Sequence, residues 1–257
     1  MSRLRFLGTG WSHGVPMIGC DCPVCTDPHP KNIRRRPSIQ IQDQHVSVVV
    51  DVGPDFRDQA LTFGIERLDA VFITHQHADH VMGMDDVRRL TWIREAPVPV
   101  WAEPAALDRL RILYPYVAEE RTPASAVPRL RFKRWTEPVE IGSLRFQPIP
   151  VPHGSLPCVG VRIDTPRGSV GYVPDCSDLP PSALRALKGV DIMILNALRK
   201  APHPSHLAFD RSRVLLEEIN APRSYFTHMG CPLDYREIQP TLPDGLDLAW
   251  DGLVVDV

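Results

Sequence analysis

Short apolar runs rich in β-branched residues recur along the chain, and Gly, Pro and Asp bound most of them. Such runs are typical of β-strands, because Val, Ile and aromatic side chains pack well on a pleated surface. The pattern predicts strands at 4–8, 38–42, 46–53, 68–75, 98–102, 130–135, 144–151, 158–163, 169–175, 191–196, 223–228 and 247–257.

Between these runs, other segments carry apolar residues at helical spacing. We predict helices at 55–64, 85–94, 104–114, 182–189 and 209–220. The two classes alternate and strands predominate, so we expect an α/β fold of two sheets packed face to face with helices outside. A doubly wound parallel sheet is the alternative, but the closely spaced runs at 144–151, 158–163 and 169–175 favour antiparallel hairpins.

Composition limits the class of protein. The apolar fraction of 43% and the charged fraction of 23% are typical of a globular chain, and we treat residues 1–257 as a single domain without internal repeats. The net charge of −2 favours neither nucleic acid nor an anionic membrane as a partner. We expect a cytoplasmic protein with reduced cysteines, since the first residues predict a strand rather than a signal peptide.

The stretch "THQHADH" at 74–80 places three histidines and an aspartate directly after an apolar run. Alternate side chains of an extended segment face the same way, so His75 and His77 can converge. If the chain then turns into a helix, the side chains of Asp79 and His80 lie beside the point where His75 and His77 converge. One loop can therefore supply two ligands to each of two cations, and imidazole with carboxylate suits zinc or manganese.

This stretch resembles the HxHxDH signature of the metallo-β-lactamase superfamily, which implies an αβ/βα four-layer sandwich. The resemblance also implies further ligands at strand ends: His153, Asp175 and His228. It assigns one metal to His75, His77 and His153, the other to Asp79, His80 and His228, and a bridging position to Asp175. Lactamases commonly have a cysteine where Asp175 aligns, so an ester or phosphodiester hydrolase fits better.

The stretch "GCDCPVC" places Cys20, Cys22 and Cys25 within six positions. This spacing suits one structural tetrahedral zinc, but three thiolates leave one ligand missing. Cys231 lies three residues after His228, so we predict that it completes this zinc site beside the catalytic metals. The remaining thiols, Cys158 and Cys176, are expected in the core, where free cysteine acts as a small hydrophobe.

Together, "GTGWSHGVPMIGCDCPVC", the histidine loop and Cys231 resemble the PhnP-like cyclic phosphodiesterases of the carbon–phosphorus lyase pathway. That family places a mobile histidine before the helix that precedes the last metal ligand, and His206 has this position. The resemblance implies that His206 protonates the leaving alkoxide, with His203 as a less favoured substitute. Asp79 is assigned a catalytic role besides metal binding.

Two features stay open at the level of sequence. The run "RRRPS" can present Arg34, Arg35 or Arg36 to a phosphate, since guanidinium binds phosphate bidentately, or it is a solvated charged surface. His13, in "WSHGVP", either lines the pocket or packs beside a glycine turn.

We therefore expect a metal-dependent phosphodiesterase that hydrolyses a small cyclic phosphodiester to a phosphomonoester, using water activated by two divalent cations. A transfer RNA-processing endonuclease or a thioester or lactone hydrolase of the same fold is the alternative, and a non-catalytic metal-binding protein is another. No membrane partner is expected, and a homodimer stays open.

Overall fold

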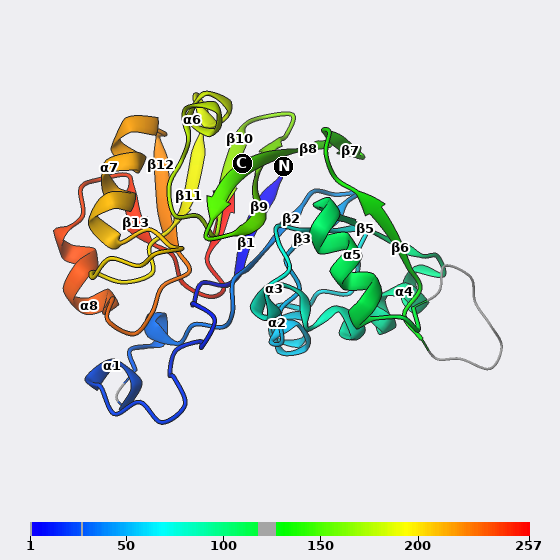
Figure 1. Cartoon of the computed structure of the whole chain (residues 1–257), viewed down its shortest axis with the longest axis horizontal. Helices are drawn as coiled ribbons and strands as arrows, with labels where there is room; N and C mark the ends of the chain where they lie inside the picture. Colours follow the sequence, from blue (N-terminus) through cyan, green and yellow to red (C-terminus); the bar gives the residue numbers. More distant parts are fainter. Residues whose placement is uncertain (1, 27, 118–126) are drawn as a thin grey trace.

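The computed structural model describes residues 2–26, 28–117 and 127–257. In this part of the chain, the strands form two seven-stranded mixed sheets (Figure 1). The first has the order β14 (Val254–Asp256), β1 (Arg3–Gly8), β2 (Ser38–Gln42), β3 (Ser47–Val50), β4 (Ala70–Ile73), β5 (Val98–Ala102), β6 (Leu130–Arg134). The second has the order β13 (Leu246–Leu248), β12 (Arg223–Thr227), β11 (Ile192–Asn196), β10 (Ser169–Val173), β9 (Leu156–Asp164), β8 (Leu144–His153), β7 (Val139–Ile141).

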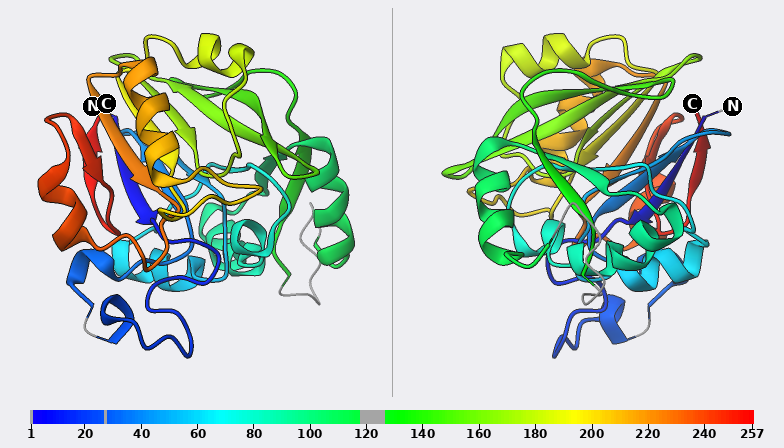
Figure 2. Two further views of the ribbon diagram at one scale, coloured as in Figure 1. Left: turned by 60° about the vertical axis from the view of Figure 1, so that its left-hand side comes forward. Right: turned by 90° about the vertical axis from the view of Figure 1, so that its right-hand side faces the viewer.

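Helices cover the outer face of each sheet, which gives the expected αβ/βα sandwich (Figure 2). The helices α2 (Phe56–Phe63), α4 (Arg88–Arg94) and α5 (Pro104–Leu113) pack on the first sheet. The helices α6 (Pro181–Leu187), α7 (Phe209–Ile219) and α8 (Tyr235–Ile238) pack on the second. Two further short helices are α1 (Pro23–Thr26) and α3 (Ala78–Val81), and 3-10 turns cover Pro30–Asn32, Met84–Val87 and Gln239–Thr241.

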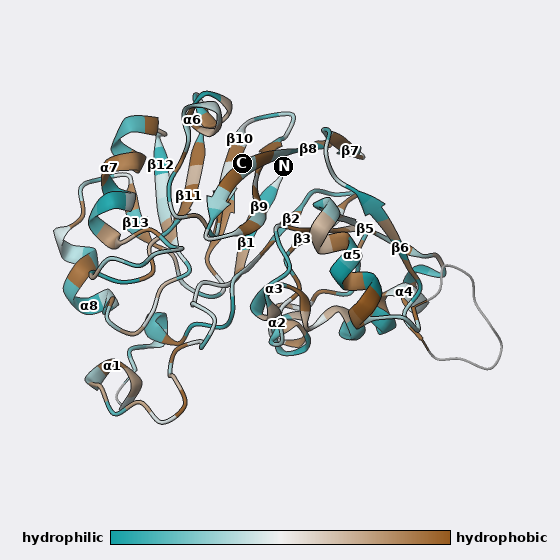
Figure 3. Ribbon diagram, viewed as in Figure 1, coloured by the Kyte–Doolittle hydropathy of each residue, from teal (hydrophilic) through white to brown (hydrophobic). Residues whose placement is uncertain are grey.

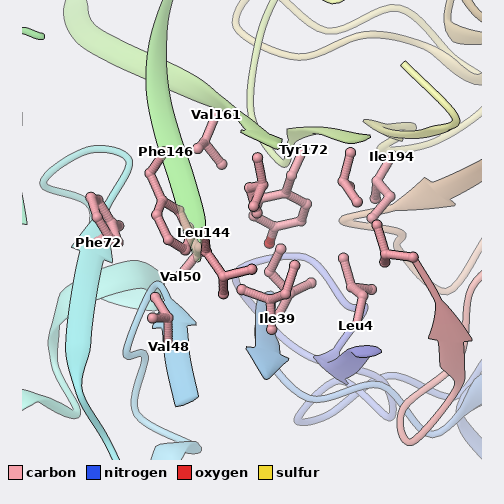
Figure 4. Packing of buried hydrophobic residues seen from close by; sticks show 14 of the residues in the cluster. Leu4, Ile39, Val48, Val50, Phe72, Leu144, Phe146, Val161, Tyr172 and Ile194 are labelled. Atoms are coloured by element: carbon pink, nitrogen blue, oxygen red, sulfur yellow. The ribbon is translucent and has the colours of Figure 1, made fainter. Parts of the chain in front are cut away.

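The central core lies between the two sheets. Phe72 of β4 stacks on Phe146 of β8 with ring centroids 4.4 Å apart, and Tyr172 of β10 enters the same cluster (Figure 4). Strands near the centre of the molecule are largely apolar, whereas the outer helices alternate apolar and polar residues (Figure 3). Burial of both sheet faces explains why the strands are such clear apolar runs in the sequence.

The predicted strand at 247–257 is wrong. Its first part, β13, pairs with β12 in the second sheet, and its last part, β14, pairs with β1 in the first. A turn separates them, in which Leu253 N–H donates to the Trp250 carbonyl at 3.0 Å and Gly252 has a φ of +93°. Hydropathy cannot reveal this break, because both halves are apolar.

Two further expectations need correction. The first part of the helix predicted at 85–94 is a 3-10 turn at Met84–Val87, and α4 begins only at Arg88. Strand β7 was not predicted, because its three residues are only half-buried or exposed.

No helix among the described residues combines the length and hydropathy needed to cross a bilayer.

Candidate metal centre and active site

Strand ends bring the predicted ligands to one edge of the sandwich. His75 follows β4, Asp175 follows β10, His228 follows β12, and His153 is the last residue of β8. Strands β10, β11 and β12 are parallel, so their carboxyl ends share an edge. The two sheets meet beside it, where Val159 N–H donates to the Thr74 carbonyl at 3.1 Å.

His75, His77 and His153 form the first cluster. His77 Nδ1 lies 2.9 Å from His75 Nε2 and 3.2 Å from His153 Nε2. One ligand nitrogen from each ring lies within 4.8 Å of the others, which is the spacing of three ligands around one cation.

Asp79, His80 and His228 form the second cluster, beside Asp175. His80 Nε2 and His228 Nε2 each lie 3.5 Å from the same Asp79 oxygen. Asp175 connects this cluster to the first. One of its oxygens lies 2.8 Å from His80 Nε2, and one ligand atom each from His75, His80 and Asp175 lies within 4.8 Å of the other two. The structure therefore brings together the seven residues that the sequence indicated.

The ligand atoms at this point are buried and lack ordinary partners. Among the described residues, neither His80 Nε2, nor either carboxylate oxygen of Asp175, nor either ring nitrogen of His228 makes a hydrogen bond of acceptable geometry. Buried polar atoms that point at one another without hydrogen bonds are costly unless something else satisfies them. Divalent cations fit this set of imidazole and carboxylate donors.

The protonation states suit metal ligands. Burial lowers the pKa of His75 well below its usual value and that of His153 to about 4, so both rings are neutral at pH 7. Burial alone would raise the pKa of Asp175, but His228 and His80 beside it lower the pKa far below that of a free carboxyl. The first cluster therefore consists of neutral imidazoles beside an ionised Asp175, whereas Asp51, Asp79 and Asp175 raise the pKa of His80 well above its usual value.

Two residues that sequence reasoning missed support the ligands. Asp51, at the end of β3, accepts a hydrogen bond from His80 Nδ1 at 2.7 Å and from Thr74 N–H at 2.9 Å. The Ser205 carbonyl accepts a hydrogen bond from His153 Nδ1 at 2.8 Å. Each bond fixes the ring so that Nε2 faces the cluster. The sequence did contain a signal for Asp51: in the stretch "VVVDVGPD" at 48–55, this aspartate directly follows an apolar run.

The backbone around Asp51 is closely packed against α3. Val52 N–H donates to the His80 carbonyl at 2.8 Å, and a Cβ on Gly53 would lie 2.0 Å from the Asp79 carbonyl oxygen. Only glycine permits this approach. Asp51 itself has a φ of +66° and His228 a φ of +54°, a backbone conformation that is strained for residues with a side chain.

His206 lies against the same centre. Its Nδ1 is 3.0 Å from an Asp175 oxygen, and its ring centroid lies 4.7 Å from that of His153 and 5.0 Å from that of His228. The His203 ring lies behind it, with a centroid separation of 5.0 Å. His206 thus contacts Asp175 and two of the clustered histidines directly, whereas the ring contact of His203 is with His206.

The four predicted zinc ligands also converge. The Sγ atoms of Cys20, Cys22, Cys25 and Cys231 lie within 4.8 Å of one another. They join α1 to the chain segment that follows β12, and burial raises the pKa of Cys231 strongly. A thiol held protonated by burial becomes a thiolate when zinc binds, because the metal replaces the proton. The other two cysteines, Cys158 and Cys176, are buried in the core, as expected.

The arginine run serves the scaffold. Arg34 is 1% exposed, and its guanidinium donates to the carbonyls of Gly230 at 2.9 Å and Leu233 at 2.7 Å. Arg35 pairs with Asp58, and Arg36 pairs with Asp55 at 3.0 Å. His13 packs edge-on against Trp11 and is exposed. Arg34 therefore anchors the chain after the cysteine loop to the segment that carries Cys231, and Arg35 and Arg36 connect the same chain to the start of α2.

Comparison with known proteins places the chain in one superfamily by both sequence and structure. A model of the beta-lactamase superfamily domain matches residues 47–229. The crystal structure of a diphosphatase from the PhnP family is 38% identical, covers 100% of this chain and 98% of its own, and superposes with a TM-score of 0.92. Zn²⁺-bound PqqB from Methylobacterium extorquens shares only the fold, with 19% identity, coverage of 99% and 100%, and a TM-score of 0.81.

A curated relative from Porphyromonas gingivalis is longer. This protein, named octanoyltransferase, is 34% identical over 256 residues, which is 98% of this chain but 51% of the relative. The chain thus spans about half the length of that relative, whose name describes the whole protein.

Proposed function

Because the chain belongs to the metallo-β-lactamase superfamily and, within it, to the PhnP family, we propose that it is a metal-dependent phosphodiesterase that opens a small cyclic phosphodiester. The observation that carries the proposal is the convergence of His75, Asp79, Asp175 and their neighbours on one buried point where ligand atoms lack hydrogen-bond partners. Two divalent cations, zinc or manganese, would be held by the two histidine clusters, with Asp175 shared between them.

Bound cations at this point would lower the pKa of water and offset charge on phosphoryl oxygens. The protein residues supply orientation and a proton. Asp79 and Asp175 keep negative charge beside the histidines, and Asp51 holds His80 in one orientation. The Nδ1 atom of His206 faces an Asp175 oxygen at 3.0 Å. The other ring nitrogen, Nε2, is therefore available to protonate the departing oxygen.

The cysteine cluster supports a structural role for a third metal. Cys231 lies three residues after His228, so a zinc held by the four thiolates would brace the wall of the site rather than take part in the reaction.

Cleavage of a phosphoanhydride is a second candidate, favoured by the 38% identical PhnP-family relative described as a diphosphatase. Both reactions would place a phosphoryl group at the same pair of cations, but only the alkoxide expelled from a cyclic diester needs a proton donor, because a phosphate leaves readily as an anion. They differ in products, because a cyclic diester gives one phosphomonoester, whereas an unsymmetrical diphosphate ester gives two phosphorylated fragments.

The test is turnover of bis(p-nitrophenyl) phosphate by protein loaded with zinc, manganese or nickel, with Asp175→Asn as the matched inactive variant. Cyclic ribose phosphates, cyclic nucleotides, linear diesters and nucleoside diphosphate esters are then compared by phosphorus NMR of the products. Wild-type turnover that Asp175→Asn abolishes supports a phosphoryl hydrolase. Hydrolysis of thioesters or lactones instead of phosphoesters, salt-dependent cleavage of transfer RNA precursors, or no turnover with any metal would favour the corresponding alternative.

A further inference from the structure

The segment 199–207 connects β11 to α7 (Figure 1). It contacts the candidate metal centre through the Ser205 carbonyl, 2.8 Å from His153 Nδ1, and through His206 Nδ1, 3.0 Å from Asp175. Both of its ends are tied down. At the first end, Gly230 N–H donates to the Leu198 carbonyl at 2.9 Å, and Phe209 N–H of α7 donates to the Arg199 carbonyl at 2.9 Å. Leu207 N–H donates to the Cys176 carbonyl at 3.0 Å, next to Asp175. The segment is therefore an ordered part of the wall of the site.

A local hydrogen bond shapes the middle of this segment. Ser205 N–H donates to His203 Nδ1 at 3.3 Å, and the Ser205 hydroxyl lies 3.2 Å from the same nitrogen. An acceptor two residues before the donor is the arrangement by which Asn and Asp side chains build tight turns. Pro204 restricts His203 to extended backbone, so the ring is held over the turn.

His203 accepts here only as a neutral ring with its proton on Nε2. Burial lowers the pKa of His203, and repulsion from His206 and Arg199 lowers it further, which favours that form.

Ser205 links this turn to both sides of the active site. Its carbonyl accepts the hydrogen bond from His153 Nδ1 at 2.8 Å, so the orientation of a metal-binding ring depends on the Ser205 peptide. The next residue, His206, places Nδ1 at 3.0 Å from Asp175. A shift of one peptide would therefore move His153 and His206 together.

We propose that His203 is a positioning residue of this site: by accepting the Ser205 N–H, its ring fixes the backbone of Ser205, whose carbonyl orients His153 and whose following peptide leads into His206. It acts through Ser205 and is neither a metal ligand nor the proton donor. The effect on turnover rests on the proposed phosphoryl hydrolysis, but the effect on the segment itself does not.

The experiment compares His203→Ala with His203→Asn in the full chain. An Asn amide oxygen can accept a hydrogen bond from the N–H two residues later but cannot carry a proton at neutral pH. For His203→Ala we expect turnover of bis(p-nitrophenyl) phosphate to fall by about 10- to 100-fold, mainly in kcat, as for loss of a partner that orients a ligand. His203→Asn should recover most of this loss and keep the wild-type pH profile. The exposed His45, mutated to Ala, is the control and should leave turnover unchanged.

Two measurements are independent of catalysis. Amide hydrogen exchange of peptides covering 199–207 should become faster in His203→Ala and return towards the wild-type rate in His203→Asn. Zinc should also leave the catalytic site faster in His203→Ala when a chelator is added. These readouts test the positioning role even if no phosphoester is turned over, which would count against the proposed function alone.

Two results would overturn the inference. If His203→Asn restores slow exchange but is as inactive as His203→Ala and loses one limb of the pH profile, then His203 takes part in the chemistry directly. If His203→Ala changes neither exchange nor zinc release, then the hydrogen bond to Ser205 does not organise the site.

Discussion

His80 and Asp51 share a hydrogen bond of 2.7 Å between Nδ1 and a carboxylate oxygen, and both side chains are fully buried. Burial raises the pKa of Asp51, and His80 opposes this rise. The pair keeps the proton on His80 Nδ1 and turns Nε2 towards Asp175 at 2.8 Å. A carboxylate behind a histidine in this way both selects the tautomer and increases the basicity of the ligand nitrogen.

We therefore expect Asp51→Asn to weaken the catalytic metal site without altering any ligand. The amide can offer its NH₂ group to His80 Nδ1, which would move the proton to Nε2 and block that nitrogen. Metal affinity measured by chelator competition, and turnover with it, should fall by about 10- to 100-fold. Asp43→Asn is the matched control, because Asp43 accepts hydrogen bonds in a distant hairpin turn. Equal affinities for the two variants would show that Asp51 does not support His80.

The placement of His206 predicts a dependence on the leaving group. A p-nitrophenolate ion leaves readily without a proton, whereas an alkoxide needs one. His206→Ala should therefore lower turnover of an alkyl phosphodiester by about 10²- to 10⁴-fold and affect bis(p-nitrophenyl) phosphate much less. The measurement is kcat/KM for both substrates, with the metal content of the variant checked first. An equal loss for both substrates would mean that His206 supports the metal centre instead of donating a proton.

The sequence allowed prediction of most strands and of the 75–80 cluster for a physical reason, whereas His153, Asp175 and His228 were implied by the family resemblance. Burial on both faces leaves a strand such as β11 as a continuous apolar run, and several metal-binding residue types directly after such a run, as at His75 and His77, mark a sheet edge. These signals are local, so they survive without knowledge of the tertiary structure.

The features that could not be predicted depend on contacts between distant segments. Nothing near Arg34 indicates that its charge is buried on the carbonyls of Gly230 and Leu233, about 200 positions away in the sequence. The support of His153 by Ser205 likewise exists only because segment 199–207 lies over the end of β8. The break between β13 and β14 was missed because the apolar residues on both sides hid the turn at Asp251 and Gly252, although this dipeptide favours a turn.

The cysteine cluster predicts a metal that is structural rather than catalytic. Replacing Cys22 by Ser should lower the zinc content by one equivalent and make the loop around α1 more sensitive to proteolysis, because the thiolates supply its cross-links. Turnover should fall less than in Asp175→Asn. Asp21→Asn is the control for metal content, since the exposed Asp21 lies between Cys20 and Cys22 but outside the cluster. An unchanged zinc content in Cys22→Ser would exclude this site.

Asp251 predicts a pH dependence of stability. Its side chain is only 5% exposed, and its carboxylate accepts hydrogen bonds from Thr9 and from Arg35 N–H, yet burial outweighs them and raises its pKa to about 7. The folded state therefore keeps a proton that the unfolded state loses near pH 4, and it binds more protons across this window. The contribution of Asp251 to the free energy of unfolding is fully present below about pH 4. It is lost as the pH rises to about 7, by at most ~1.4 kcal/mol per pH unit.

Chemical denaturation of the wild type and of Asp251→Asn from about pH 5 to about pH 8, at constant metal loading, isolates this contribution. The amide does not titrate, so the wild type should lose free energy of unfolding relative to the variant as the pH rises, and the difference should level off above the pKa of Asp251. The exposed Asp256, mutated to Asn, should give a difference that does not vary with pH over the same range. If the wild type instead gains stability relative to Asp251→Asn on going to high pH, then the hydrogen bonds from Thr9 and Arg35 outweigh burial, and Asp251 is an ionised anchor between β1 and the last turn.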